Sequence, residues 1–259
     1  MASSWAAYNE LAWTEGLLAD PGDYEGEVGR YVDLIKRYSS HAPYTLLHLG
    51  CGAGGHDTVF KRHYAVTGVD ISRGMLDRAR LRHPDLEYIE DDMRTVRLGR
   101  TFDAVVIPDS IDYMSSLPEL RMTIETAAAH LKPGGILLVA GKTLEIFRDN
   151  NFAYTGEQEN LHVTLLENNY INRYRPDTYE ATLVYLIRER GELTVHTECH
   201  VLGLFPQEAW EKVFAEAGLS LQEADLDGTY DKYLLGGGEY PLKIFIGRKY
   251  PLSADHDGK

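Results

Sequence analysis

A short apolar segment, Leu46 to Leu49, runs directly into a cluster of four glycines within residues 50–55. An apolar run of this length that is stopped by glycine predicts a buried strand rather than a helix. Glycine lets the backbone turn sharply and lets a ligand lie against bare N–H groups. A helix after such a loop directs its N-terminus toward that ligand. The segment therefore predicts a strand, a ligand-binding loop and a helix, although many structural turns also contain two glycines.

An acidic residue, Asp70, follows a second short apolar run over residues 65–69. An acidic residue at the end of the second strand is where nucleoside-binding folds hold the ribose hydroxyls. The glycine loop and Asp70 together predict a nucleoside-cofactor site; the alternative is a structural turn beside an unrelated aspartate.

The composition restricts the partners that we expect. The 259 residues carry a formal net charge of -14, which disfavours nucleic acid and anionic membrane surfaces as partners. Cys51 and Cys199 give neither a disulfide framework nor a zinc pattern, and we predict no metal site. The N-terminus lacks the features of a signal peptide, and no apolar run reaches membrane-spanning length. We expect a cytoplasmic protein with a small-molecule partner, and we leave homodimer formation open.

Helix-like and strand-like segments alternate as far as residue 140. Helical patterns are expected at 5–20, 24–38, 56–62, 75–82 and 117–131, and short strands at 46–49, 65–70, 86–89, 102–107 and 136–140. Pro21 and Gly22 separate the first two helices, and Ser72 is a candidate cap for the helix at 75–82. This alternation predicts an α/β fold whose parallel sheet is covered by helices on both faces.

The alternation of helix-like and strand-like segments ends after residue 140. Strand-like runs at 162–166, 179–188 and 193–202, with a hairpin connection at 188–192, predict a small antiparallel insertion over residues 141–202. The earlier pattern resumes over residues 203–250, with a helix at 206–217 and strands at 219–224 and 243–247. We interpret residues 1–140 and 203–250 as one cofactor-binding core, the insertion as an acceptor lid, and residues 251–259 as a frayed polar tail.

Five segments resemble the class I S-adenosylmethionine-dependent methyltransferases: LLHLGCGAGG, VTGVDIS, EDDMR, FDAVVI and LKPGGILLV. A closer resemblance is to bacterial N,N-dimethyltransferases of nucleotide-linked amino sugars. It rests on Tyr8, on DYEGEV at 23–28, on DDMR at 91–94, on RLGRTFDAVV at 97–106 and on ECHVLGLF at 198–205. The resemblance implies a Rossmann-like fold with a seven-stranded, mostly parallel sheet, helices on both faces and a small antiparallel lid. It also implies S-adenosylmethionine as cofactor and S-adenosylhomocysteine as product.

The resemblance assigns residues to the cofactor. The glycines would approach its amino-acid and ribose parts, Asp70 would bind the ribose hydroxyls, and Tyr8 would hydrogen-bond the methionine carboxylate. Asp92 would accept from the adenine amino group and Met93 would donate its N–H to the ring. The full set of implied cofactor residues is Tyr8, His48, Gly50, Gly52, Asp70, Ile71, Met75, Asp92, Met93, Ile107 and Pro108, of which Ile71 packs on adenine and the last two line the donor methyl.

Two positions depart from the pattern of the family. His48 stands where the family usually has Asp or Glu, and a neutral imidazole accepts from an ammonium only if its free nitrogen points there. The loop after the fourth strand, residues 107–113, also differs from the mostly neutral loop of the sugar enzymes. It is not the Asn/Asp-Pro-Pro-Tyr loop of amide-nitrogen methylases, which argues against a nucleic-acid base or a glutamine as acceptor.

The acceptor site is expected outside the carboxyl ends of the strands, under the insertion. Asp109 and Asp112 lie at that edge, where carboxylates attract a protonated amine and one of them can take its proton. The alternative is one helix-capping and one solvated aspartate. His200 is a candidate base, with a structural histidine as the alternative. The remaining candidate acceptor residues are aromatic: Tyr24, Tyr113, Tyr170 and Tyr174, the last two in an insertion that also holds Tyr179 and Tyr185.

We therefore predict a small-molecule methyltransferase that prefers an amine nitrogen, with Asp109 and His200 as catalytic candidates. A small-molecule O-methyltransferase is the first alternative, because an oxygen acceptor needs a base near neutral pH. A non-catalytic cofactor-binding protein with the same fold is the second alternative, because fold does not determine function.

Overall fold

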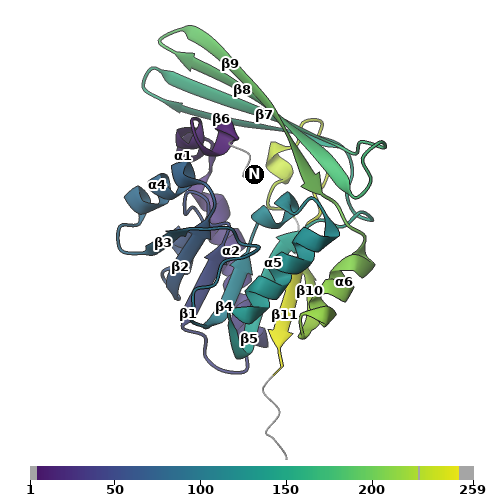
Figure 1. The fold of residues 1–259 in the computed structure, drawn as a ribbon. Coiled ribbons are helices and arrows are strands. Elements are labelled where there is room, and N and C mark those ends of the chain that lie inside the picture. Colours follow the sequence, from purple (N-terminus) through teal and green to yellow (C-terminus); the bar gives the residue numbers. More distant parts are fainter. Residues whose placement is uncertain (1–4, 227, 251–259) are drawn as a thin grey trace, which may run out of the picture.

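The central sheet has seven strands in the order β10-β11-β5-β4-β1-β2-β3 (Figure 1). The computed structural model of the protein describes residues 5–226 and 228–250. The strands are β1 (Thr45–Leu49), β2 (Ala65–Asp70), β3 (Glu87–Glu90), β4 (Phe102–Ile107), β5 (Leu131–Gly141), β10 (Leu219–Asp225) and β11 (Lys243–Lys249). Strand β11 runs antiparallel to both neighbours, and the other pairs are parallel. The prediction of a seven-stranded, mostly parallel sheet is confirmed.

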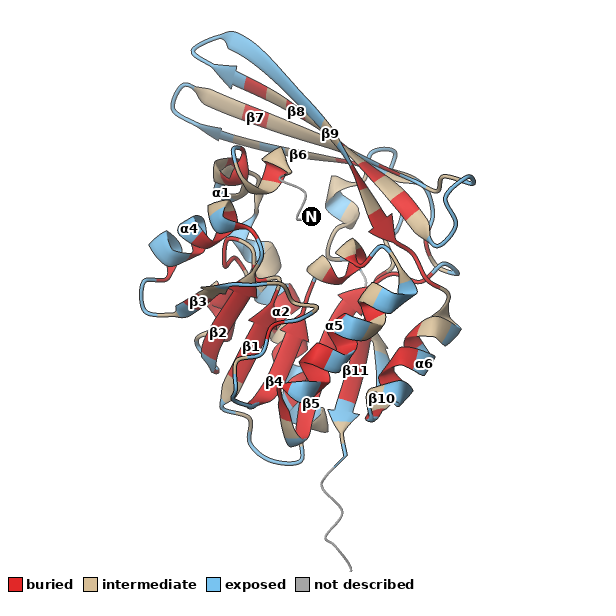
Figure 2. Ribbon diagram, viewed as in Figure 1, coloured by how far each residue is buried: buried red, intermediate tan, exposed pale blue. Residues whose placement is uncertain are grey.

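Helices cover both faces of this sheet because successive side chains of each strand point in opposite directions. Leu46 and Val106 face α2 (Pro21–Tyr38) and α3 (Asp57–Phe60). Leu47 and Val105 face α5 (Leu117–Ala129) and α6 (Gln207–Glu216). Figure 2 accordingly shows the middle strands almost entirely buried.

Capping residues set where several of the helices begin and end. Asp20 accepts from the Gly22 N–H at 2.9 Å, and α2 begins at Pro21, three residues earlier than predicted, because proline suits the first helical turn. Ser72 accepts from the Met75 N–H and caps α4 (Arg73–Arg82), as predicted. The single helix expected at residues 5–20 is instead η1 (Ala6–Tyr8), η2 (Ala12–Thr14) and α1 (Glu15–Leu18). Asn9 leaves the helical region and its amide donates to the Trp5 carbonyl, which ends the first turn.

A second sheet of four antiparallel strands lies over the carboxyl ends of the parallel strands (Figure 1). We call it the lid; its strands are β6 (Asn150–Gln158), β7 (Leu161–Tyr170), β8 (Thr178–Glu189) and β9 (Glu192–Gly203). Strand β6 escaped prediction because its sequence, NNFAYTGEQ, is largely polar, and it becomes a strand through its long pairing with β7. The predicted antiparallel insertion is confirmed, and its role as a moving lid stays a prediction.

The N-terminal segment joins the lid to the core. The Glu198 carboxylate on β9 accepts from the backbone N–H groups of Ala6 and Ala7, at 3.0 and 2.8 Å. Ala7 and Leu11 then pack against the lower face of the lid, beside Val163 and Leu183. Within the part of the chain that the structure describes, no helix is long and apolar enough to cross a membrane. The predicted tail, residues 251–259, lies outside the described residues.

Candidate active site

A cavity of ≈ 770 Å³ lies between the carboxyl ends of the parallel strands and the lid. We call the part lined by the glycine loop and the ends of β2 and β3 the cofactor half. The acceptor half is lined by the lid, by η3 (Ser110–Tyr113) and by Tyr230, Tyr240 and Leu242. A cavity at the carboxyl edge of a parallel sheet is the usual place for a ligand in this kind of fold.

The glycine loop is held to the end of β2 by backbone hydrogen bonds. Gly50 and Cys51 both donate to the Val69 carbonyl, at 2.7 and 3.0 Å, and the Asp70 carboxylate accepts from the N–H groups of Gly52 and Ser72, each at 2.8 Å. Burial raises the pKa of Asp70. A Cβ on Gly52, whose φ is +52°, would meet no protein atom within 4 Å. The loop therefore leaves open space on its cavity side, beside a carboxylate that is fixed in place.

Three polar rings form a chain at the roof of the cavity. The hydroxyls of Tyr8 and Tyr113 are hydrogen-bonded to each other, and the Tyr113 hydroxyl lies 3.0 Å from Nδ1 of His200. Trp5 stacks on the His200 ring at 4.5 Å between centroids. His200 Nε2 lies 3.3 Å from a Glu198 oxygen, yet burial lowers the pKa of His200, so the imidazole is neutral at pH 7. Neutral imidazole can accept a proton through this chain.

Asp109 presents its exposed surface to the interior of the cavity. It stands at the N-cap position of η3, but its side chain caps nothing, and no partner for its carboxylate occurs among residues 5–226 and 228–250. Burial within the protein and the negative charge of Glu27 raise the pKa of Asp109 to about 6, against the opposing effect of Lys142. Asp109 is thus a free carboxylate inside the site.

Asp112 has a partner of its own. The Lys142 ammonium makes an ion pair with Asp112 and lies 3.2 Å from the Tyr179 hydroxyl, which also donates to Asp112 at 3.0 Å. Burial opposes the charge of Lys142, but Asp112 outweighs it and holds the pKa of Lys142 well above its usual range. The predicted acceptor residue Asp112 lines the cavity, but its charge is neutralised there.

Comparison with known proteins identifies the family. A family model described as a methyltransferase domain matches residues 46–135. The dTDP-3-amino-3,6-dideoxy-alpha-D-glucopyranose N,N-dimethyltransferase of Streptomyces fradiae is 33% identical over 77% of this chain and 79% of that protein. The chain belongs to the S-adenosylmethionine-dependent methyltransferases. The resemblance seen in the sequence is therefore confirmed.

Solved structures of other methyltransferases share the fold. DesVI of Streptomyces venezuelae has a TM-score of 0.74 at 27% identity, over 88% of this chain and 92% of that one. CalS10, an amino pentose methyltransferase from Micromonospora echinaspora with S-adenosylmethionine bound, has a TM-score of 0.72 at 24% identity, over 93% of this chain and 95% of that one. The Rossmann-like class I methyltransferase fold is thus confirmed.

The cofactor half of this methyltransferase fits S-adenosylmethionine. Ile71 is 49% exposed and lines the cavity next to Asp70, where an adenine ring would cover it. Met75, Asp92 and Met93 also line this half. Burial opposes ionisation of Asp92, but Arg94 outweighs it and lowers the pKa of Asp92, so this carboxylate stays charged. The open glycine loop, a fixed carboxylate and an exposed apolar side chain together suit a nucleoside.

Three predicted cofactor residues do not line the cavity of this methyltransferase. His48 is buried within β1, and its Nδ1 lies 2.7 Å from Oδ1 of Asp57, the first residue of α3. Ile107 and Pro108 are buried at the end of β4, directly behind Asp109. After β1 the cavity lining begins at Gly50, and after β4 it begins at Asp109.

The predicted aromatic residues divide into two groups. Tyr24 lines the cavity, donates to Glu15 at 3.0 Å and packs edge-on against His56. Tyr113 lines it as described above. Tyr170 and Tyr174 are 47% and 95% exposed and lie outside the cavity lining, because they belong to the end of β7 and the β7–β8 loop at the outer edge of the lid. The structure does not bring these two residues to the acceptor half.

Sequence reasoning missed two charged residues of the acceptor half. Lys142 directly follows β5, so the same rule that drew attention to Asp70 and Asp109 could have found it. Glu167 lies on β7, lines the cavity and accepts from the Asn169 amide at 2.8 Å; burial raises its pKa. The sequence around a carboxylate in a half-buried strand does not show whether the side chain points into the cavity or toward solvent.

Proposed function

We propose that this methyltransferase transfers methyl groups to the amine nitrogen of a small basic molecule. The observation that supports this most directly is the unpaired carboxylate of Asp109 inside the cavity. Such a carboxylate attracts an ammonium group and places it at the boundary between the two halves. The names of the relatives agree with this choice, since the Streptomyces fradiae protein is named as an amino-sugar N,N-dimethyltransferase.

The cofactor would be held by the residues that line its half. Asp70 would bind the ribose hydroxyls, Ile71 and Met93 would enclose the adenine, and Tyr8 would donate to the carboxylate of the methionine part. When bound, S-adenosylmethionine supplies a methyl group that its positive sulfur already activates. The work left to the protein is to align the acceptor and to accept a proton.

Nitrogen attacks only as the neutral amine, so the proton of the ammonium must leave first. Asp109, with a pKa of about 6, can bind the ammonium as a carboxylate and pass its proton to solvent in the cavity. The aromatic lining of the acceptor half favours a cation as well, since Tyr154, Tyr179 and Tyr240 present rings to it.

One observation favours the alternative of oxygen methylation. The neutral His200, linked to the cavity through the Tyr113 hydroxyl, is placed to take a proton from a substrate hydroxyl. On that mechanism His200 is essential and the Asp109 carboxylate is dispensable.

The test is Asp109→Asn, which keeps the shape of the side chain and removes its charge. We expect KM for amine acceptors to rise at least tenfold while the Kd for S-adenosylmethionine changes less than twofold. Asp77→Asn, at an exposed position of α4, is the matched control. Loss of cofactor affinity with unchanged acceptor binding would assign Asp109 to the cofactor half and remove the support for an amine.

A further inference from the structure

The acceptor half has few positive charges to offer a ligand. Among the described residues that line the whole cavity, Arg and Lys occur at three positions, Arg73, Arg94 and Lys142. Arg73 belongs to α4 beside Asp70, and Arg94 makes ion pairs with Asp92 and Glu119, so both lie on the cofactor side. In the acceptor half, Asp112 neutralises Lys142 in a buried ion pair. His56, which also lines the cavity, is paired with Glu27 at 3.2 Å.

Negative charge remains after this pairing. Asp109 lies at the inner end of the acceptor half and Glu167 lies on the lid above it. Glu167 is hydrogen-bonded by the neutral Asn169 amide, and it makes no ion pair among the described residues, although the charge of Lys142 acts on it at a distance. The acceptor half therefore attracts cations and repels anions.

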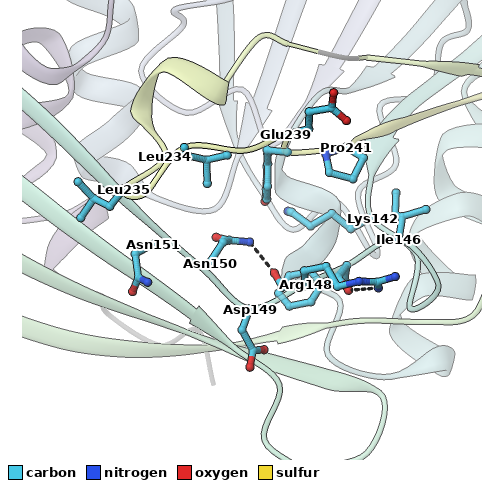
Figure 3. A pocket seen from close by; sticks show the side chains of 13 residues that line it. Lys142, Ile146, Arg148, Asp149, Asn150, Asn151, Leu234, Leu235, Glu239 and Pro241 are labelled. Carbon is cyan, nitrogen blue, oxygen red and sulfur yellow. Dashed lines mark hydrogen bonds between the residues drawn. The ribbon is translucent and has the colours of Figure 1, made fainter.

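A second cavity of ≈ 200 Å³ adjoins the first and shares Lys142 and Tyr240 with it (Figure 3). Arg148 lines it, but two carboxylates, Asp149 and Glu239, line it as well. The Arg148 guanidinium is turned back onto the carbonyls of Glu145 and Phe147.

The backbone near the second cavity does not have the pattern of a typical anion site. The glycine segment that borders the second cavity, residues 236–238, has successive φ values of +92°, +73° and +122°. Right- and left-handed residues alternate in a typical anion-binding nest, whereas these three glycines all have positive φ. The N-terminus of α5 is capped by Ser116 and carries the acidic Glu119, so it is no phosphate site either.

A nucleotide-linked amino sugar places a diphosphate one sugar ring away from its amine. With the amine at Asp109, the lining carboxylates of Asp109 and Glu167 would repel the phosphates. Phosphate recognition normally uses Arg, Lys or helix N-termini, and the acceptor half offers none of these unpaired among the described residues.

We propose that the acceptor of this methyltransferase is an amine that carries no phosphate, such as an amino sugar in free or glycosidic form, and that Glu167 is a residue that excludes nucleotide-linked acceptors. This inference rests on the amine methylation proposed above. It also separates the chain from its Streptomyces fradiae relative, whose name specifies a dTDP-linked sugar.

The experiment compares two forms of one amino sugar at pH 8. Binding of dTDP-3-amino-3,6-dideoxy-α-D-glucose and of the methyl glycoside of the same sugar is measured by calorimetry on the protein saturated with S-adenosylhomocysteine. We expect the glycoside to bind at least tenfold more tightly and dTDP alone to show no binding. Equal or tighter binding of the dTDP sugar, or failure of the glycoside to bind, overturns the proposal.

Glu167→Gln tests the assigned residue, since the amide keeps an oxygen that accepts from Asn169. We expect the ratio of the two affinities to fall at least threefold, with tighter binding of the dTDP sugar. Glu189→Gln makes the same charge change at the exposed end of β8 and should leave the ratio unchanged. An unaltered ratio in Glu167→Gln overturns the role of Glu167.

Failure of the proposed function gives a different result. If the acceptor is a hydroxyl, amines of both kinds remain unmethylated while neutral alcohols release S-adenosylhomocysteine. If amines are methylated but the dTDP sugar is the better one, the amine proposal stands and the phosphate-free proposal falls.

Discussion

Nδ1 of His48 and Oδ1 of Asp57 lie 2.7 Å apart in a fully buried pair that joins the end of β1 to the start of α3. The Tyr88 hydroxyl donates to the other Asp57 oxygen at 2.9 Å. Burial alone would raise the pKa of Asp57, but His48 and Tyr88 outweigh it and lower that pKa. The glycine loop spans the residues between the two partners, so the pair holds both of its ends. We therefore propose that His48 supports the shape of the loop.

The first prediction removes one partner of this pair. His48→Leu leaves the buried Asp57 carboxylate without its imidazole hydrogen-bond partner, which costs about 1–3 kcal/mol or more of unfolding free energy. Urea denaturation at pH 7 measures this loss. The double variant His48→Leu/Asp57→Leu should recover most of it, because no uncompensated charge is left. A double variant as unstable as the single one would contradict the proposed coupling.

The second prediction concerns the open side of the glycine loop. Gly52→Ala places a methyl group in the space that the cofactor would occupy, at a positive φ that costs roughly 1–2 kcal/mol for a non-glycine residue. Gly99, with φ +67° and no atom near its Cβ, lies in an exposed loop far along the chain. Gly99→Ala should lose the same stability but keep its cofactor affinity. Calorimetry with S-adenosylmethionine should show at least tenfold weaker binding only for Gly52→Ala. Equal affinities of the two variants would indicate that the loop is a structural turn and not part of the cofactor site.

The sequence predicted the parts of the site that depend on local patterns. The glycine loop, Asp70 and Asp109 each follow a short apolar strand, and residues at the carboxyl ends of parallel strands meet at one edge of the sheet. The alternation of strands with helices also predicted the parallel sheet with helices on both faces. These features depend on residues close together in the chain.

The parts that escaped prediction depend on contacts between distant residues. The family resemblance placed His48 at the cofactor, but its ring is buried and lies against Asp57, nine residues later. The pairing of Asp112 with Lys142, thirty residues apart, removes a charge that the sequence alone leaves free. Glu167 faces the cavity because of the register of β7 with its neighbours, which no single strand reveals.

The third prediction is the pH dependence of kcat/KM with an amine acceptor. Asp109 has a raised pKa of about 6, so it is ionised above that pH and neutral below it. Binding of an ammonium needs the ionised form, and kcat/KM should fall as the pH drops through 6. At higher pH the profile should keep rising as the amine loses its proton. In Asp109→Asn, the change in kcat/KM near pH 6 should disappear, and the rise at higher pH should remain. If the change near pH 6 persists in this variant, another group causes it.

The fourth prediction separates nitrogen from oxygen methylation. His200→Gln preserves a polar side chain but cannot take a proton near neutral pH. If an amine is the acceptor, kcat should fall less than tenfold, since amine methylation needs alignment more than a base. A loss of a hundredfold or more, together with a nearly unaffected Asp109→Asn, would favour oxygen methylation. Steady-state assays that follow S-adenosylhomocysteine release give both numbers.

The last prediction concerns the lid. Its outer end is weakly packed: Leu193 and Val195 on β9 are 50% and 52% exposed, whereas the middle of β1 is fully buried. Local opening requires less free energy where few apolar contacts are broken. Amide hydrogen exchange in the free protein should therefore be faster in β8 and β9 than in β1.

The same experiment tests what holds the lid to the core. Glu198→Ala removes the acceptor of the Ala6 and Ala7 N–H groups, so exchange at these amides and along β9 should rise at least tenfold, with β1 unchanged. Glu192→Ala, at the exposed start of β9, is the control and should have no such effect. Cofactor binding should slow exchange at residues 6–11, because Tyr8 lines the cofactor cavity. Protection of β9 equal to that of β1 in both the native protein and Glu198→Ala would show that the lid and core open as one unit.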